Sequence, residues 1–374
     1  MTPDETVALD GDTVLARRLA TQRLVGSPLP TAAAVVDLLT CVQAQEWAHA
    51  VWSLGMRSEG SSHDGIVAAF DAGDLLRTHL LRPTWHLVAP ADIGWILGAT
   101  AERVHQKNAG MYRREGVDAA TAARAGELMA ALLEGGRALT RTEIGERLAA
   151  AGLEAPVGMR LTYLVMHAEL EGLIVSGPMR GQQHTYALLA ERLAGRPEST
   201  PDDPVAELWR RFVVGHGPTS VRDFARWSSL TLTVARAAAG RVADRLESAM
   251  IGEEELWWDP DAPDAEPAAA REAVRLLPLY DELPLSYPRL SFPMAAGHPH
   301  PPDDDLRWGS VIAGLGNVGV WRRTIVDGRR RTVRVSAALA PGTTARQRAA
   351  VDTELGRLAA FLDAEPVREE WNRR

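Results

Sequence analysis

Cysteine and lysine are nearly absent from this 374-residue chain. Cys41 is the only cysteine, which excludes a disulfide framework and any cysteine-based zinc or iron–sulfur site. Lys107 is the only lysine, so 40 of the 41 basic residues are arginine. Because Schiff-base chemistry needs an amine, only Lys107 and the amino terminus could supply one.

Long apolar runs are also absent, and no stretch approaches the roughly 20 apolar residues that a membrane span requires. The acidic, polar start of the sequence resembles neither a secretory signal nor a transit peptide. We therefore expect a cytoplasmic protein that has no membrane partner. The chain contains neither a GxSxG nucleophile motif nor an HExxH metal motif, and we expect no metal and no cofactor.

The net charge of −8 is unusual for a protein that binds nucleic acid, but the charges are unevenly distributed. Residues 207–245 hold seven arginines and three acids, and residues 319–348 hold eight arginines and one acid. Acidic residues gather instead in segments 253–255, 259–266 and 303–305. This segregation allows a basic face on an acidic protein, although solvated surface arginines would give the same pattern.

Three successive segments share one predicted order, in which helices are followed by two short strands. In residues 1–112 the apolar spacing predicts helices and strands at 13–25, 31–39, 63–72, 75–81 and 84–88. We expect residues 41–45 to lie at the end of the second of these helices. Three helices closed by a hairpin make the outline of a winged helix.

The next two segments repeat this outline. Residues 113–197 have predicted helices near 119–133, 140–148 and 159–170, and then a hairpin with a Gly/Pro-rich turn. Thr140 and Glu143 form a capping-box pair that starts the middle helix. Residues 198–260 have predicted helices near 204–215, 219–227 and 231–246 and a strand pair within 249–258. Three similar units in succession favour duplication.

Residues 270–374 differ from these units and predict a β-rich domain. Strands are expected within 274–288, 310–326 and 331–339, with a hairpin turn at Asp327-Gly328 and a helix over 344–362. The glycines of 314–319 match GxGxxG but lack a following helix, so dinucleotide binding is not favoured. The predicted fold class is α+β, with tandem winged-helix units followed by this domain.

The residues that could carry chemistry are few. In a winged helix, Arg160, Thr162 and His167 would lie on the helix that enters a DNA major groove, although a solvated helix face is the simpler interpretation. Gln43 and Gln45 could both turn into one cleft from a helix end, but either could equally serve as a cap or turn residue. We interpret Cys41 as a core residue.

Four stretches resemble the AlkZ-like winged-helix DNA glycosylases. They are TCVQAQEWAHAVWSLGMR, LLRTHLLRPTWHLVAPADIGWIL, LLPLYDELPLSYPRL and NVGVWRRTIVDGRR, and the resemblance covers roughly residues 12–340. The QxQ motif, Gln43 to Gln45, is typical of the family's glutamine branch, which the resemblance links to antibiotic self-resistance. Pro83 departs from the glycine that is usual before the threonine of the RxTxH element.

The resemblance implies a monofunctional glycosylase that hydrolyses the N-glycosidic bond of N7-alkylated purines in double-stranded DNA, with bulky adducts or interstrand crosslinks of DNA-alkylating natural products as substrates. Gln43 and Gln45 would then be catalytic, and Arg82, Thr84 and His86 would bind DNA. A structural histidine is the alternative for His86. We expect a monomer. A non-catalytic winged-helix transcriptional regulator and a protein-interaction module remain as alternatives.

Overall fold

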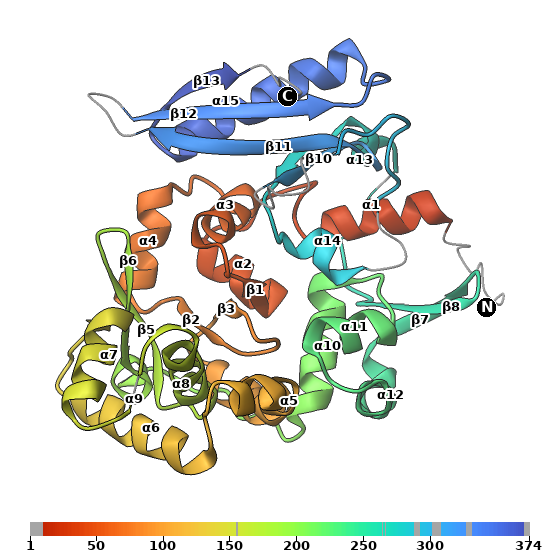
Figure 1. Ribbon diagram of the computed structural model, residues 1–374. Coiled ribbons are helices and arrows are strands. Elements are labelled where there is room, and N and C mark those ends of the chain that lie inside the picture. Colours follow the sequence, from red (N-terminus) through yellow and green to blue (C-terminus); the bar gives the residue numbers. More distant parts are fainter. Residues whose placement is uncertain are drawn as a thin grey trace.

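The computed structural model describes residues 10–154, 156–263, 265, 267–287, 292–300, 308–326 and 331–369. It confirms the predicted fold class, with three helical units that end in small sheets and a larger C-terminal sheet (Figure 1). Among the described residues, no helix combines the length and the apolar character that a membrane crossing needs.

The first unit alternates helices and strands around a three-stranded sheet. Its elements are α1 (Gly11–Thr21), α2 (Ala32–Leu39), β1 (Cys41–Gln43), α3 (Trp47–Arg57), α4 (His63–Ala72), β2 (Leu76–His79) and β3 (Trp85–Val88). Thr31 caps α2 by accepting a hydrogen bond from the backbone N–H of Ala34. The left-handed Gly73 ends α4, as the sequence predicts. The sheet is antiparallel in the order β1-β3-β2.

The prediction that residues 41–45 lie at a helix end is wrong, because residues 41–43 form strand β1. Thr40, at φ 65°, ends α2 and turns the chain directly into the strand. The strand is buried on both sides: Cys41 packs in one hydrophobic core and Val42 in another. Periodicity cannot distinguish such a short, doubly buried strand from a continued helix, which explains the error.

The second unit follows α5 (Ile93–Arg114), a long helix that was not predicted from the sequence. Its elements are α6 (Ala119–Leu133), β4 (Leu139–Thr140), α7 (Arg141–Ala150), α8 (Gly158–Leu170), β5 (Ile174–Arg180), β6 (Gln183–Leu188) and α9 (Leu189–Leu193). The Thr140–Glu143 capping box is present at the start of α7. The sheet order β4-β6-β5 repeats that of the first unit, with the same succession of helices and strands.

The third unit keeps this order with a reduced sheet. Its main elements are α10 (Pro204–His216), α11 (Val221–Ser228), α12 (Leu232–Arg241), β7 (Glu247–Ile251) and β8 (Glu254–Trp258). An isolated bridge between Thr219 and Trp257 occupies the place of the short first strand of the other units. The same topology therefore occurs three times, which supports duplication more strongly than the sequence alone.

The C-terminal part is a five-stranded sheet in the order β13-β12-β11-β10-β9. It comprises α13 (Pro267–Glu272), β9 (Val274–Leu277), α14 (Glu282–Ser286), β10 (Gly309–Ala313), β11 (Gly316–Val326), β12 (Thr332–Leu339), α15 (Ala345–Phe361) and β13 (Glu365–Glu369). The predicted strand over 274–288 is right only for β9, because Tyr280 at φ 62° turns the chain and Asp281 caps α14. The glycine-rich 314–319 joins β10 to β11 without a following helix, and Asp327-Gly328 lies outside the described residues.

Each of the two large hydrophobic cores joins segments that are far apart in the sequence. One joins α1–α4 to the C-terminal sheet and α15, and the other joins α5 to the second and third units. The sheet of the first unit lies between them: Leu87 belongs to the first core, whereas its neighbour Val88 belongs to the second. The QxQ motif therefore sits where both cores meet, in the middle of Figure 1.

Candidate active site

The end of β1 presents Gln43 on the sheet face that packs toward the second core. Gln43 lies opposite His86 of β3, and His86 lies opposite Thr78 of β2, so the three form one row across the sheet. Only 7% of Gln43 is exposed. Gln45 comes after the strand and is half-buried. The described residues show no hydrogen bond between the two glutamine amides.

Arg82 holds the side chain of Gln43. Its Nη2 donates to Oε1 of Gln43 at 2.7 Å, and its Nη1 donates to the backbone carbonyl of Trp227 at 2.6 Å. Because a guanidinium only donates, Oε1 of Gln43 must face it and the amide nitrogen must point elsewhere. Burial lowers the pKa of Arg82, and the negative charge of Glu282 opposes that shift. The group remains a cation at neutral pH.

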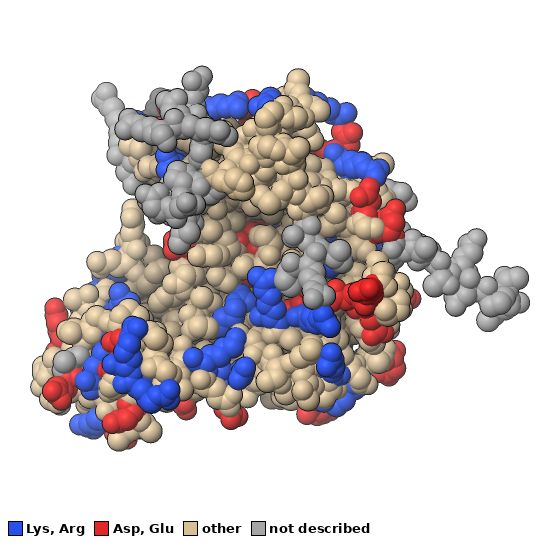
Figure 2. Space-filling model, turned by 45° about the vertical axis from the view of Figure 1, so that its right-hand side comes forward, with Lys and Arg blue, Asp and Glu red and all other residues tan. Residues whose placement is uncertain are grey.

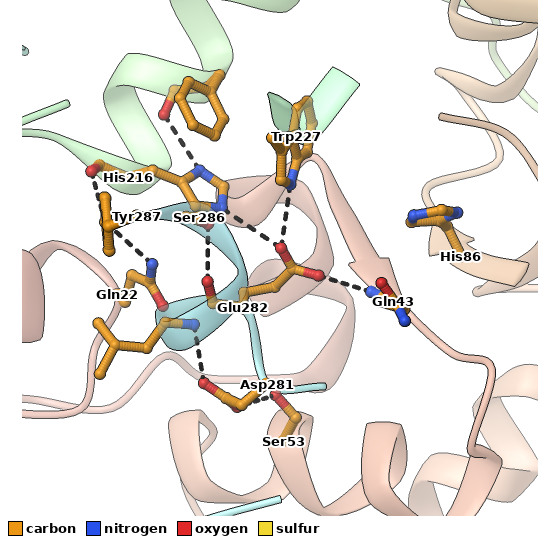
Figure 3. A network of polar contacts seen from close by, with 12 residues as sticks. Gln22, Gln43, Ser53, His86, His216, Trp227, Asp281, Glu282, Ser286 and Tyr287 are labelled. Atoms are coloured by element: carbon orange, nitrogen blue, oxygen red, sulfur yellow. Dashed lines mark hydrogen bonds and ion pairs between the residues drawn. The ribbon is translucent and has the colours of Figure 1, made fainter. Parts of the chain in front are cut away.

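Glu282 of α14 holds the backbone of Gln43 from the other side. One carboxylate oxygen accepts from the backbone N–H of Gln43 at 2.7 Å, and the other accepts from Nε1 of Trp227 at 3.0 Å. Glu282 is completely buried. Figure 3 shows its carboxylate between Gln43 and Trp227, with His216 on the same side as Trp227 and His86 beyond Gln43.

A buried ion pair anchors α14 beside this carboxylate. Both oxygens of Asp281 accept from Arg57 at 2.8 Å, and Ser53 donates to one of them at 2.7 Å. The side chains of Asp281 and Arg57 are fully enclosed. Burial acts to raise the pKa of Asp281, but the Arg57 charge and the hydrogen bonds outweigh it and hold the pKa below its ordinary value. The pair thus fixes α14 against α3.

His86 is less open than a direct phosphate contact would need, whereas its neighbour Thr84 is only half-buried. His86 is completely buried, and burial followed by the nearby Arg82 holds its pKa well below 6.5, so the ring is neutral. Its Nε2 lies 3.2 Å from Nη2 of Arg82 and accepts, which puts the ring proton on Nδ1. Thr84 is half-buried, and its hydroxyl has no hydrogen-bond partner among the residues described.

Gln45 opens onto a pocket of about 500 Å³ between the first and second units. Its lining includes Gln45, Trp47, Arg77, Trp85, His184 and Tyr186. The Arg77 guanidinium lies over the Trp85 ring, 4.4 Å from its centroid. Burial followed by the charge of Arg77 lowers the pKa of His184 to about 3, so His184 is neutral. Oε1 of Gln45 is enclosed and has no partner within the described part of the chain.

Several cations near Arg82 lack a neutralising acid. Arg103 donates to the backbone carbonyl of Ser229 and Lys107 donates to its hydroxyl, at 3.2 and 3.0 Å. Partial burial, followed by the charges of Arg103 and Arg82, lowers the pKa of Lys107. Within the described ranges, no carboxylate lies within 4.0 Å of any of these three cations. Figure 2 shows basic side chains along the edge of a hollow in the face that is turned forward there.

Comparisons with known proteins agree with this architecture. The sequence model of the AlkZ-like DNA glycosylases matches residues 36–361. The chain belongs to the AlkZ-like DNA glycosylase family. It is 27% identical over 228 residues to an interstrand DNA cross-link repair glycosylase of Streptomyces sahachiroi, a match that covers 59% of this chain and 61% of that protein.

The fold of this AlkZ-like chain also resembles a solved structure. The DNA glycosylase AlkZ of Streptomyces sahachiroi superimposes with a TM-score of 0.77 and 22% identity, over 98% of this chain and all of the other. The resemblance inferred from the four sequence stretches is therefore confirmed. The roles of individual residues are not tested by these comparisons and remain predictions.

Two residues around the QxQ strand of this AlkZ-like protein were not predicted from the sequence. Both come from distant segments: Glu282 accepts from the backbone N–H of Gln43, and Trp227 contacts Glu282 and Arg82. One signal was present: the adjacent acids Asp281 and Glu282 interrupt an otherwise apolar stretch. Buried acids at such a position are candidates for a functional site.

One group of side chains in the AlkZ-like structure could share a metal ion. His105 of α5 and His167 and Glu171 at the end of α8 offer ligand atoms within 4.8 Å of one another in the described residues. None of the QxQ or Arg82 contacts involves this group. The expectation that the protein needs no metal or cofactor stays a prediction.

Proposed function

We propose that the protein is a monofunctional DNA glycosylase that hydrolyses the N-glycosidic bond of N7-alkylated purines. The observation that supports this most directly is the placement of Gln43, whose amide oxygen faces Arg82 while its backbone is tied to Glu282. Family membership adds independent support, because the matching family is one of DNA glycosylases. The proposal assigns the catalytic role to Gln43 and Gln45.

The chemistry of the leaving group explains how amides could suffice. Glycoside hydrolysis usually needs a carboxylic acid to protonate the leaving group, and the transition state resembles an oxocarbenium ion. A guanine alkylated at N7 is already cationic. When water adds to C1′ and the C1′–N9 bond breaks, the bonding electrons neutralise the base, and the excess water proton passes to solvent. The protein must then only place the water, which an amide oxygen can do.

Arg82 would link the binding of DNA to the state of the Gln43 amide. In the free protein it occupies the amide oxygen of Gln43. A phosphate would compete for the guanidinium through stronger, charge-assisted hydrogen bonds. Moving Arg82 to a phosphate would release the amide oxygen to bind water. We therefore propose that Arg82 and the neighbouring Thr84 contact a phosphate. His86 would orient Arg82 through the hydrogen bond between the two side chains.

The pocket beside Gln45 supports a bulky lesion. Its volume of about 500 Å³ lies within the usual range for small-molecule sites, and its wall combines the rings of Trp47, Trp85 and Tyr186 with several polar and charged side chains, which suits a bulky substituent of mixed polarity. Smaller lesions are more often flipped into a tight pocket. The relative from Streptomyces sahachiroi is named for interstrand cross-link repair. We accordingly propose crosslinks and bulky adducts of DNA-alkylating natural products as substrates, and self-resistance as the role.

The test is excision from a defined duplex. Wild-type protein is incubated with duplex DNA that carries one N7-methylguanine or one bulky N7-alkylguanine, and abasic sites are then cleaved with alkali. We expect strand breaks at the lesion, none at unmodified guanine, and none without alkali. Borohydride should trap no protein–DNA adduct, since a trapped adduct would indicate a lyase step through Lys107 or the amino terminus.

Two results would contradict the proposal. The first is the absence of breaks above background with every lesion, together with tight binding to one undamaged sequence, which would favour the transcriptional regulator. The second is an absence of both excision and DNA binding, which would favour a protein-interaction module. The Arg124→Ala variant is a control, because Arg124 is exposed on α6 and, among the residues that the structure describes, pairs only with Glu127.

A further inference from the structure

Glu282 is a buried acid that has no arginine or lysine partner in the part of the chain that the structure describes. Its two carboxylate oxygens each accept one N–H, from the Gln43 backbone and from the Trp227 indole. The nearest basic atom among those residues is Nε2 of His216 at 3.9 Å, which forms an ion pair with the carboxylate only when His216 is protonated. Both oxygens therefore act as hydrogen-bond acceptors, as the oxygens of a carboxylate do.

The neighbouring acid, Asp281, is neutralised by an arginine. Asp281 is just as buried, yet Arg57 forms two hydrogen bonds with it, one to each oxygen. Burying an ionised carboxylate without a cation costs free energy, so proteins usually pair or replace it. Asp281 alone already anchors α14 to α3. A structural ion pair therefore does not explain why Glu282 is buried. Buried acids with unusual electrostatic surroundings are often found at functional sites.

The position of Glu282 relative to Arg82 suggests that explanation. Gln43 lies between them, with its backbone N–H on Glu282 and its side-chain oxygen on Arg82. In the free protein the two opposite charges flank Gln43 and offset each other across it. If Arg82 moves to a DNA phosphate, the negative charge of Glu282 remains behind Gln43.

We infer that Glu282 is a positioning residue that fixes Gln43 and keeps a negative electrostatic potential where the sugar becomes positively charged. The inference rests on the proposed glycosylase function and deepens it. Glu282 takes no proton and does not touch the substrate. In other glycosidases a carboxylate faces the reacting carbon directly, whereas Glu282 lies behind the amide of Gln43. Its fixed negative charge would still favour the positively charged transition state.

The size of the effect follows from Coulomb's law. We take C1′ to lie about 8 Å from the carboxylate, in surroundings of effective dielectric constant about 20. At that distance the charge of Glu282 favours a unit positive charge at C1′ by a factor of roughly 30. Glu282→Gln keeps the shape of the side chain and removes the charge. It should therefore slow single-turnover excision of N7-methylguanine by roughly 30-fold, while the Kd for the same duplex changes by less than about threefold.

A pair of stable abasic-site analogues separates charge from structure. One duplex carries a pyrrolidine analogue, whose protonated amine mimics the positive sugar, and the other carries a neutral tetrahydrofuran. Wild-type protein should bind the pyrrolidine duplex roughly 30-fold more tightly than the tetrahydrofuran duplex. Glu282→Gln should bind both alike, whereas Glu282→Asp should keep most of the preference. Glu127→Gln, which removes an exposed charge on α6, should behave as wild type.

The outcomes distinguish this inference from the proposed function. Equal binding of both analogues by wild-type protein overturns the inference even if Glu282→Gln does not fold. A preference that survives in a folded Glu282→Gln variant also overturns it, because a merely structural role would leave the ratio unchanged. Failure of wild-type protein to excise any lesion contradicts the glycosylase function itself, whichever analogue is preferred.

Discussion

The buried pair of Arg57 and Asp281 predicts a large loss of stability when one partner is removed. Arg57 donates to both oxygens of Asp281 and to the backbone carbonyls of Gln22 and Ser53, with no exposure to solvent. Asp281→Asn keeps the size of the side chain but leaves the guanidinium buried without a counter-charge. Breaking a buried pair in this way costs about 3–5 kcal/mol.

Urea unfolding followed by far-ultraviolet circular dichroism at pH 7 measures this cost. The pair joins α3 to α14 within one hydrophobic core, so its loss should shift the unfolding transition of the first unit and the C-terminal sheet together. The control is Arg124→Ala, which breaks an exposed pair with Glu127 and should cost less than about 1 kcal/mol. A loss below about 1 kcal/mol for Asp281→Asn would refute the reasoning.

The pH dependence of the same variant gives a second check. Because the pKa of Asp281 is held below its ordinary value in the folded protein, its contribution to stability is present above about pH 4. The contribution is lost as the pH falls through the lowered pKa. The difference in unfolding free energy between wild type and Asp281→Asn should therefore be constant from pH 5 to 8 and shrink below pH 4. A difference that grows in acid would contradict the assignment.

Three further predictions test the packing and the site. A Cβ on Gly215 would lie 2.3 Å from the backbone oxygen of Leu38, so Gly215→Ala should lower the free energy of unfolding by about 3 kcal/mol, measured by thermal unfolding. The control is Gly240→Ala, which has open space around the new Cβ and should not lower the free energy of unfolding. Arg82→Ala should weaken binding to undamaged duplex and reduce the slope of log Kd against log salt by about 1; an unchanged slope would exclude a phosphate contact. His184, with its pKa near 3, should show no nuclear magnetic resonance titration between pH 5 and 8, and a midpoint near 6.5 would show that the pocket is open.

The sequence alone was sufficient for elements with strong local signals. The Thr140–Glu143 capping box and the α4 helix with its Gly73 end are present as predicted. Each depends on residues within a few positions of one another, and capping and turn chemistry act at that range. The family resemblance likewise came from short, ordered stretches, and the comparisons confirm it.

The surroundings of Gln43 could not be predicted in the same way. Glu282 lies 239 positions away along the chain, and Arg82 lies 39 positions away. No local pattern relates such residues; the two cores bring them together. The doubly buried strand β1 also lacks the alternation that marks a half-exposed strand, so residues 41–45 were assigned to a helix end. Long-range packing thus decides both the geometry and the charge of the candidate site.

The comparison of wild-type protein with the Gln43→Ala/Gln45→Ala double variant tests the central claim most directly. Both proteins are mixed in excess with duplex containing one N7-methylguanine, and free base released per unit time is measured by mass spectrometry. If the amides position the attacking water, the double variant should release base at least about 100-fold more slowly while still binding the duplex. Release at the wild-type rate would show that hydrolysis does not depend on the two glutamines.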